Sequence, residues 1–591
     1  MIDPLPTLQS TFGFPDFRGV QRQVVDRVLA GANTLAVMPT GAGKSLCYQL
    51  PAVTLEGTCV VVSPLIALMH DQLRAAEAIG IRAATLTSVD TNQMETIRHF
   101  RAGELDLLYV APERASGSGF RDMLGQAKLC LFAIDEAHCV SEWGHDFRPD
   151  YRLLRPLLDA FPDVPRLALT ATADAHTRAD ILDQLGIPRN GLIVAGFDRP
   201  NIRYAISPKD NVTRQIADLI AEQPGPGIVY VQTRAGTEKL AEALAKTGRP
   251  TRAYHAGLDP AVRARNQADF VASEDMVICA TVAFGMGIDK PDVRFVAHAG
   301  LPKSIEGFYQ ETGRAGRDGD PSVAHLFWGA EDFAKARQRI GEVEPHRQAG
   351  ERTRLNALGA LVETAGCRRR ILLRHFGEEP PENCGNCDNC LNPPGALTNA
   401  TEVARKFLSA VFRTGQSFGV GYIESILTGQ SSERSLMNGH EALSVFGIVS
   451  DAEEAALIKP VSRALLLRDA LRANDFGGLE FGPGARAILK GEVEVELIVP
   501  PRRERRRRGK GAAGGANPIG DPLFEALRAR RRELAQEAQV PPYVIFHDSV
   551  LREMATMKPS NRDQLSHITG VGTRKLEAYG DAFLQVIREA A

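Results

Sequence analysis

The stretch from residue 34 to residue 50 carries a glycine-rich loop of the kind that binds nucleotide phosphates. An apolar, strand-like run precedes the loop and a helix-like run follows it. Glycines let backbone N–H groups approach phosphate oxygens, a lysine reaches the β and γ oxygens, and a serine hydroxyl binds Mg²⁺. A chance glycine-rich turn is the competing interpretation, which the flanking strand and helix disfavour. We therefore predict an ATP site that includes Thr40, Gly41, Gly43, Lys44 and Ser45.

Two acidic residues end a second apolar run, residues 129–134. A phosphate loop needs a metal-holding acid at the end of another strand, and Asp135 has that position. We predict that Asp135 holds Mg²⁺ through its water shell, together with Ser45, and that Glu136 polarises the attacking water. An ordinary charged turn after a strand explains these residues alone, but it is disfavoured once they are paired with the phosphate loop.

Arginines supply the remaining charge that phosphoryl transfer requires. Residues 309–319 contain Arg314 and Arg317, three positions apart, which would share one face of a helix. From a second domain they would neutralise the developing negative charge only when the two domains close. Solvated surface arginines are the alternative interpretation. The predicted catalytic residues are Lys44, Asp135, Glu136, Arg314 and Arg317.

Four of the nine cysteines form a cluster with metal-ligand spacing. Cys384, Cys387 and Cys390 recur at every third position, and Cys367 lies upstream of them. Four thiolates complete a tetrahedral Zn²⁺ shell, which is a structural arrangement because no coordination position stays open. An iron–sulfur cluster is the alternative that the spacing leaves open. The other five cysteines are isolated, so we expect them to fill cores or to remain reduced.

The elements that must position these residues alternate between strand and helix. Continuous apolar strands separated by helices are typical of parallel sheets covered on both faces. The predicted strands are 34–38, 59–63, 107–111, 129–134, 166–170, 227–232, 276–281 and 294–299. Their number is too large for one sheet, so we predict two α/β domains joined near residue 200.

Beyond residue 340 the pattern becomes helical, then mixed, then basic, and finally helical again. Residues 502–510 contain six Arg, one Lys and one Glu, in a Gly-rich context that cannot bury a core. A final helix is predicted over 521–538, with Asp521 as N-cap and Pro522 at the first helical position. The predicted domains are 1–203, 204–340, 341–396, 397–501, 502–518 and 519–591.

Composition restricts the class of protein further. The chain has 591 residues, of which 44% are hydrophobic, and a net charge of −2. No apolar run approaches the ~18 residues of a membrane span. The N-terminal sequence lacks the basic and apolar regions of a secretion signal. We therefore expect a cytoplasmic protein without membrane contact, in which a local basic run rather than the overall charge favours nucleic acid.

Taken together, the motifs resemble those of superfamily-2 helicases and, closely, those of the RecQ family of DNA helicases. Matching segments occur in the family's order along nearly the whole chain. They include VVSPLIALMHDQ (61–72), YVAPER (109–114), LTATA (169–173), FDRPNI (197–202) and ATVAFGMGIDKPDVRFVAH (280–298). The resemblance implies an α/β fold with two RecA-like parallel-sheet motor domains. A helical zinc-binding domain, a winged-helix domain and an all-α HRDC bundle would follow.

The segment FGFPDFRGVQ (12–21) is similar to the family's adenine-reading motif. By this resemblance Gln21 bonds the adenine edge, while Phe14 and Arg18 stack on the ring. The chain departs from the family at Gly19-Val20, where Pro-Gly is common, and the change concerns the loop rather than Gln21. The resemblance also favours zinc over an iron–sulfur cluster at the four cysteines.

The stretch 141–151 is similar to an aromatic-rich loop that links DNA to the ATP site in this family. The tryptophan and phenylalanine would stack on unpaired bases, whereas the histidine and arginine would contact phosphate or the ATP site. Core packing is the alternative for the tryptophan. The predicted DNA contacts are Trp143, His145, Phe147 and Arg148. Arg368–Arg370 are expected either to touch DNA phosphate or to form a solvated helix face.

The resemblance implies an ATP-dependent 3′→5′ DNA helicase that unwinds branched or tailed duplexes in recombination, repair and replication-fork maintenance. The expected cofactors are ATP, Mg²⁺ and Zn²⁺. The expected partners are single-stranded and duplex DNA, a single-strand-binding protein and repair proteins, with the chain acting as a cytoplasmic, nucleoid-associated monomer. A translocase that does not unwind, and a non-catalytic DNA-binding or strand-annealing protein, are the alternatives.

Overall fold

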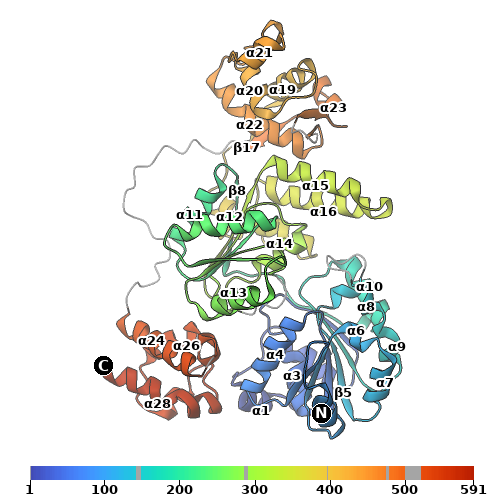
Figure 1. Ribbon diagram of the computed structural model, residues 1–591, viewed down its shortest axis with the longest axis vertical. Helices are drawn as coiled ribbons and strands as arrows, with labels where there is room; N and C mark the ends of the chain where they lie inside the picture. Colours follow the sequence, from blue (N-terminus) through green and yellow to red (C-terminus); the bar gives the residue numbers. More distant parts are fainter. Residues whose placement is uncertain are drawn as a thin grey trace.

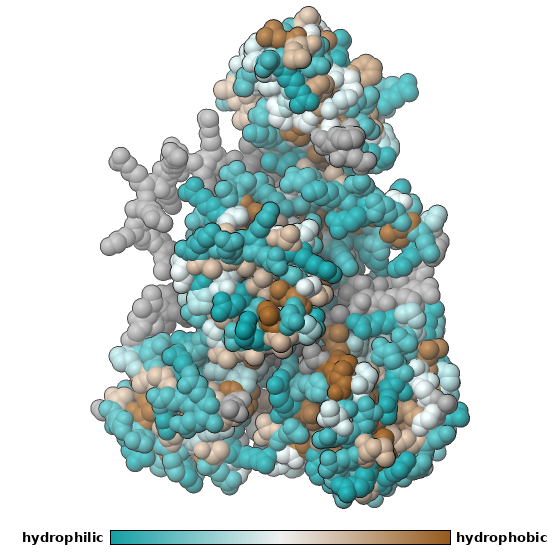
Figure 2. Space-filling view, in the orientation of Figure 1, coloured by the Kyte–Doolittle hydropathy of each residue, from teal (hydrophilic) through white to brown (hydrophobic). Residues whose placement is uncertain are grey.

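The chain folds into two α/β lobes followed by three smaller C-terminal regions (Figure 1). The structure is a computed structural model that describes residues 2–141, 148–284, 290–395, 397–473, 478–498, 521–538 and 540–590. The surface seen in Figure 2 is largely hydrophilic. None of the helices in the described part of the chain combines the length and apolar character needed to span a bilayer.

Lobe 1 is built on a seven-stranded parallel sheet with the order β3-β4-β2-β5-β6-β1-β7. Strands β1, β2 and β4 are buried at every position, because helices cover both faces of the sheet. The strands are β1 (Thr34–Val37), β2 (Thr58–Val62), β3 (Ala83–Leu86), β4 (Leu107–Val110), β5 (Leu129–Ile134), β6 (Arg166–Thr170) and β7 (Leu192–Val194). The helices are α1 (Leu5–Thr7), α2 (Gln21–Leu29), α3 (Leu46–Thr54), α4 (Ile66–Ala78), α5 (Gln93–Arg101), α6 (Pro112–Ala115), α7 (Ser118–Leu124), α8 (Pro149–Arg152), α9 (Leu154–Asp159) and α10 (Ala175–Leu185).

Lobe 2 repeats this design with a six-stranded parallel sheet in the order β10-β11-β9-β12-β13-β8. Its strands are β8 (Ile202–Pro208), β9 (Gly227–Tyr230), β10 (Thr251–Tyr254), β11 (Val277–Ala280), β12 (Phe295–His298) and β13 (Ser322–Trp328). Its helices are α11 (Val212–Glu222), α12 (Arg234–Ala245), α13 (Pro260–Ala272) and α14 (Ile305–Thr312).

The C-terminal regions are mainly helical. A cysteine-bearing region contains α15 (Ala330–Glu342), α16 (Pro345–Glu363), α17 (Arg368–His375) and α18 (Asp388–Leu391). A mixed region contains α19 (Thr401–Arg413), α20 (Val420–Leu427), α21 (Glu433–Met437), α22 (Ala452–Leu467), α23 (Ala485–Lys490) and the short strands β14 (Leu397–Asn399), β15 (Leu471–Ala473), β16 (Leu479–Phe481) and β17 (Glu496–Ile498). A terminal bundle contains α24 (Pro522–Glu537), α25 (Pro542–Ile545), α26 (Asp548–Met557), α27 (Arg562–Ser566) and α28 (Thr573–Glu589).

Sequence patterns located the main elements correctly. All eight predicted strands are present within two residues of their predicted ends, and the two-sheet fold class is confirmed. The N-terminal cap of α24 is confirmed as well, because the Asp521 side chain accepts a hydrogen bond from the Leu523 amide. Residues 502–518 lie outside the described part of the chain.

The segment 197–202 joins the two lobes and is held by the cysteine-bearing region. The Phe197 ring stacks on Phe376, with 4.7 Å between centroids. Arg369 binds the Asp198 carboxylate at 2.9 Å and the Ile202 carbonyl at 2.6 Å. The prediction that Arg368 and Arg369 touch DNA or form a solvated face is therefore wrong. They are 8% and 4% exposed, because protein carbonyls and carboxylates bind their guanidinium groups.

Candidate nucleotide and metal sites

Residues 38–45 connect the carboxyl end of β1 to α3 and form the predicted phosphate loop. Gly41 and Gly43 have φ values of +84° and +74°, a left-handed conformation that glycine adopts without strain. A Cβ added to Gly43 would collide with the Gln21 amide nitrogen, so a side chain at this position would displace Gln21. Lys44 lies at the end of the loop, with its ammonium group 3.4 Å from the Met38 carbonyl.

The predicted adenine motif is attached directly to the phosphate loop. Gln21 is 4% exposed; its amide nitrogen donates to the Ala42 carbonyl at 2.9 Å, and its oxygen accepts from the Arg18 amide at 2.8 Å. The Arg18 guanidinium lies 5.6 Å from the centroid of the Phe14 ring. The three residues therefore lie together beside the loop, and their role in adenine recognition stays a prediction.

The two predicted acids lie on the same sheet edge as the phosphate loop, because β5 and β1 both flank β6 in a parallel sheet. Burial, together with the charge of Glu136, raises the pKa of Asp135 to about 6, while Lys44 opposes the shift. Glu136 has a φ of +47°, a strained value for a residue with a side chain. The buried Asp135 and the partly exposed Glu136 repel each other beside Lys44, and with the Ser45 hydroxyl they form a donor set that fits Mg²⁺.

Two further residues belong to this acid cluster and were not predicted as site residues. His138 Nδ1 lies 3.3 Å from the Glu136 carboxylate and 3.0 Å from the Thr170 hydroxyl at the end of β6. The Tyr151 hydroxyl donates to the Asp135 carbonyl at 3.0 Å. The sequence signal for both was present, because His138 lies two positions after Glu136 and Tyr151 closes the stretch that follows the acids.

Arg199, in the segment between the lobes, bonds to both lobes at the cleft. Its guanidinium donates to the Thr40 carbonyl of lobe 1 at 2.7 Å. The same group donates to three lobe-2 carbonyls, those of Gly313 at 3.1 Å and of Ala315 and Gly316 at 2.9 Å each. Burial lowers the pKa of Arg199, and the nearby Arg317 charge adds to this effect. The side chain therefore joins the phosphate loop to the turn that carries the predicted arginines.

The two predicted arginines occupy different environments. Helix α14 ends at Thr312, so the expectation that Arg314 and Arg317 share one helix face is wrong. Arg314 is 5% exposed and lies inside lobe 2 beside Tyr230, whose pKa burial raises to about 12 against the opposing Arg314 charge. Arg317 lies at the phosphate loop, since a Cβ added to Gly41 would be 3.3 Å from Arg317 Cγ.

The predicted DNA contacts Trp143, His145 and Phe147 lie outside the described residues. Arg148 is described, and its guanidinium donates to the Pro64 carbonyl at 2.8 Å while its amide donates to the Cys139 carbonyl. Pro64 belongs to the segment 61–72 that begins at the end of β2. The downstream end of the loop is therefore anchored to lobe 1 next to the two acids.

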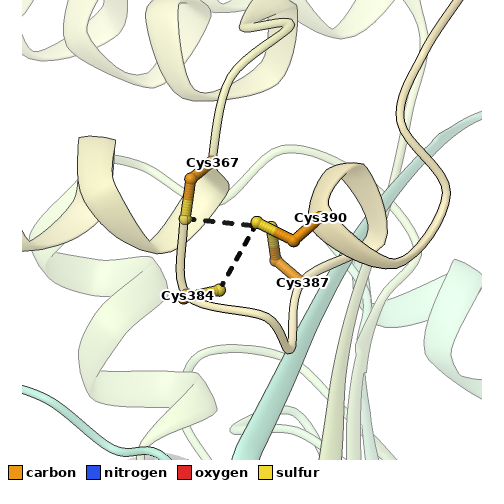
Figure 3. Close-up of side chains that lie close together, drawn as sticks. All are labelled: Cys367, Cys384, Cys387 and Cys390. Atoms are coloured by element: carbon orange, nitrogen blue, oxygen red, sulfur yellow. Dashed lines mark hydrogen bonds between the residues drawn. The ribbon is translucent and has the colours of Figure 1, made fainter. Parts of the chain in front are cut away.

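The four clustered cysteines converge on one point (Figure 3). Their sulfur atoms all lie within 4.8 Å of one another, with Cys384 3.9 Å from Cys390 and Cys387 4.0 Å from Cys367. Tetrahedral zinc, with sulfur about 2.3 Å from the metal, requires sulfur atoms about 3.8 Å apart. Cys367 and Cys387 also occupy the N-cap positions of α17 and α18, so two of the four thiols lie at helix starts.

Comparison with known proteins matches every region of the chain. Family models described as DEAD/DEAH box helicase, helicase conserved C-terminal domain, RecQ zinc-binding, RQC domain and HRDC domain match residues 18–181, 211–319, 330–391, 394–506 and 521–587. The ATP-dependent DNA helicase RecQ of Haemophilus influenzae is 41% identical, over 99% of this chain and 96% of that protein. The chain belongs to the RecQ family.

Two other RecQ relatives match over comparable lengths. The Pasteurella multocida protein is 40% identical over 99% of this chain and 93% of its own length. The Bacillus subtilis protein is 39% identical over 98% of this chain and 97% of its own length. The RecQ zinc-binding match at residues 330–391 includes all four clustered cysteines and favours zinc over an iron–sulfur cluster.

Removal of one thiol should release the metal. Cys387 is fully buried and lies within the cluster, so Cys387→Ser should lower bound zinc from about one ion per chain to near zero. Bound metal is measured by elemental analysis after gel filtration. Cys130→Ala is the matched control, because burial raises the pKa of that thiol to about 12 and it lies outside the cluster. Iron with acid-labile sulfide in the unaltered protein would contradict the zinc assignment.

Loss of the Arg199 guanidinium should slow ATP hydrolysis more than it weakens ATP binding. Arg199→Ala removes the bonds that place residues 313–316 and Arg317 at the phosphate loop, so kcat should fall about 10- to 100-fold with KM within threefold. Steady-state ATPase measurements test this. Arg189→Ala, at an exposed position of lobe 1, should leave both constants unchanged. A rise in KM alone would show that Arg199 serves binding rather than positioning.

Proposed function

We propose that the chain is an ATP-dependent DNA helicase whose ATP site lies between the two lobes. The observation that carries the proposal is the meeting of both lobes at the phosphate loop. Lobe 1 supplies Lys44 and the two acids, while lobe 2 brings Arg317 and the carbonyls bound by Arg199 to Thr40 and Gly41. A nucleotide bound in this place contacts both lobes. Its hydrolysis therefore removes contacts that favour the closed arrangement of the lobes.

Each side chain has a definite part in the proposed hydrolysis. Lys44 and the loop amides bind the phosphates, and Arg317 stabilises the charge that develops on the γ-phosphate. Mg²⁺, held by Ser45 and by Asp135 through water, would neutralise phosphate charge. Glu136 orients the attacking water and accepts its proton, and His138 fixes the Glu136 carboxylate against Thr170. We propose a structural rather than catalytic role for Arg314, because it is buried inside lobe 2.

We propose that DNA is coupled to this chemistry through the stretch 141–151. Its described end is tied to the acids, because Tyr151 binds the Asp135 carbonyl and the Arg148 amide binds the Cys139 carbonyl. A DNA strand that binds Trp143, His145 and Phe147 would shift these hydrogen bonds and thereby change the positions of Asp135 and Glu136. DNA-stimulated ATP hydrolysis follows from such a link.

The RecQ relatives are named ATP-dependent DNA helicases, which supports DNA as the substrate class, and we propose that both single-stranded and duplex DNA are bound. We further propose 3′→5′ movement on branched or tailed duplexes, in recombination, repair and replication-fork maintenance. A single-strand-binding protein and repair proteins are the proposed partners. We propose that the chain works as a monomer in the cytoplasm, in association with the nucleoid.

The lysine of the phosphate loop provides a direct test of the proposed ATP site. Lys44→Ala removes the cation that reaches the β and γ oxygens, so DNA-stimulated ATPase should fall at least about 100-fold. Affinity for single-stranded DNA, measured by fluorescence anisotropy without nucleotide, should stay within twofold. Unchanged ATPase in this variant would place the active site elsewhere.

The same preparations test unwinding and its polarity. Duplexes with a 3′ or a 5′ single-stranded tail are incubated with the unaltered protein and with Lys44→Ala, and strand release is followed by gel electrophoresis. The proposal requires ATP-dependent release from the 3′-tailed duplex by the unaltered protein alone. ATPase without release from either substrate would indicate a translocase, and DNA binding without ATPase a non-catalytic binding or strand-annealing protein.

A further inference from the structure

The HRDC domain (521–590) is docked on lobe 2, and its first contact is made through a largely buried carboxylate. Figure 1 places α24 and α26 beside the two lobes and away from α21 of the mixed region. Glu274, just after α13, lies 2.6 Å from Arg531, 2.6 Å from Arg532 and 3.1 Å from Arg528, all on α24. The Glu274 side chain is 10% exposed, so three guanidinium groups enclose a single carboxylate.

A second carboxylate of lobe 2 makes a matching contact. Asp320 receives two hydrogen bonds from Arg552 on α26, at 2.7 and 2.5 Å, in the bidentate geometry of an arginine–oxyanion pair. Between these points the ammonium of Lys290 lies 5.8 Å from the centroid of the HRDC Tyr543 ring. The lobe-2 contact is therefore dominated by charge.

Lobe 1 contacts the start of the last HRDC helix. A Cβ added to Gly13 would lie 3.2 Å from Gly572 Cα, and one added to Gly80 would lie 2.5 Å from the Arg574 guanidinium. Gly13 directly precedes Phe14 of the adenine motif, and Gly572 is the N-cap of α28. The docked HRDC domain therefore touches both lobes, and it does so beside the nucleotide site.

Because the contacts with lobe 2 are mainly ion pairs next to solvent, we expect docking of the HRDC domain to be reversible. A crevice of about 2820 Å³ runs between the HRDC domain and the lobes, and Glu274, Asp320, Arg528 and Arg552 all line it. Ion pairs beside water are weakened by salt and exchange readily with other anions. Several guanidinium groups around one oxyanion is the arrangement that recognises phosphate, so the two carboxylates occupy positions that phosphates fit.

We propose that Glu274 and Asp320 hold the HRDC face that binds DNA phosphates, so that docking on the lobes and DNA binding by this domain exclude each other. In the docked state the domain links the two lobes and restrains their relative motion. DNA that takes over Arg528, Arg532 and Arg552 releases the domain and frees the lobes. The inference rests on the proposed action on DNA, and it assigns the HRDC domain a restraining role until DNA arrives.

Substitutions on the two sides of the Glu274–Arg532 ion pair distinguish two cases: competition between DNA and lobe 2 for the HRDC arginines, and docking that does not affect DNA binding. Glu274→Gln and Arg532→Ala both weaken the same ion pair, but only Arg532→Ala removes a phosphate ligand. Glu274→Gln should raise affinity of the full chain for poly-dT about three- to tenfold at low salt, because it frees arginines. Arg532→Ala should lower or preserve that affinity. Fluorescence anisotropy over a salt series measures both.

Two matched controls and a structural readout accompany the variants. Arg530 lies on the same helix but pairs with Glu533 within it, and Glu242 is an exposed residue of α12 that pairs with Lys246, so Arg530→Ala and Glu242→Gln serve as the controls. We expect Arg530→Ala to stay within twofold of the unaltered protein, and Glu242→Gln to leave affinity unchanged. Hydrogen exchange of residues 272–275 should rise in Glu274→Gln, in Arg532→Ala and on addition of poly-dT to the unaltered protein.

The outcomes distinguish this inference from the proposed function. If Glu274→Gln and Arg532→Ala change poly-dT affinity in the same direction, or if poly-dT leaves exchange at 272–275 unchanged, the competition is refuted. Unwinding by the unaltered protein would still support the helicase proposal in that case. Absence of any poly-dT binding by the unaltered protein would instead refute both.

Discussion

The guanidinium of Arg199 is the interaction on which the geometry of the nucleotide site depends. It bonds the phosphate loop through Thr40 and the turn before Arg317 through the carbonyls of Gly313, Ala315 and Gly316. A buried cation is costly unless its donors are matched, and four carbonyls match them here. Because Arg199 lies between β7 and β8, the segment that links the lobes also fixes how their charged residues meet.

The cysteine-bearing region holds the segment between the lobes in place through several hydrogen bonds. Arg368 bonds Asp388, Asp388 accepts from the Ile206 amide of β8, and Arg369 bonds both Asp198 and the Ile202 carbonyl. Cys367 and Cys387 begin the two helices that carry these residues. Zinc at the four thiols would therefore stabilise the link between the lobes, although the metal site contains none of the residues assigned to ATP chemistry.

The sequence predicted those elements and motifs that can be recognised from a short run of neighbouring residues. Runs such as 129–134 are continuously apolar because strands of a covered parallel sheet are buried on both faces. Strands β3, β7, β8, β10 and β13 were not among the named strands, and the mixture of polar and apolar residues in β10 and β8 gives a weaker pattern. The phosphate loop, the two acids and the four cysteines were found because their chemistry fixes both residue type and spacing.

Residues whose roles depend on distant partners could not be found in this way. Arg199 belongs to the matching segment 197–202, but nothing in that segment points to its partner Thr40, 159 positions away in sequence. Arg368 and Arg369 look like a solvated basic face, yet their partners lie in the segment between the lobes and in α18. Arg314 and Arg317 were expected on one helix face, but α14 ends before them and separates a buried arginine from one at the nucleotide loop.

The most direct test of this account is a crystal structure of the unaltered protein with Mg²⁺ and a non-hydrolysable ATP analogue. The account predicts that the γ-phosphate lies between Lys44 and Arg317, with Arg199 still bonded to the turn at residues 313–316. A structure in which the analogue contacts lobe 1 alone, with Arg317 turned away from the phosphates, would contradict it.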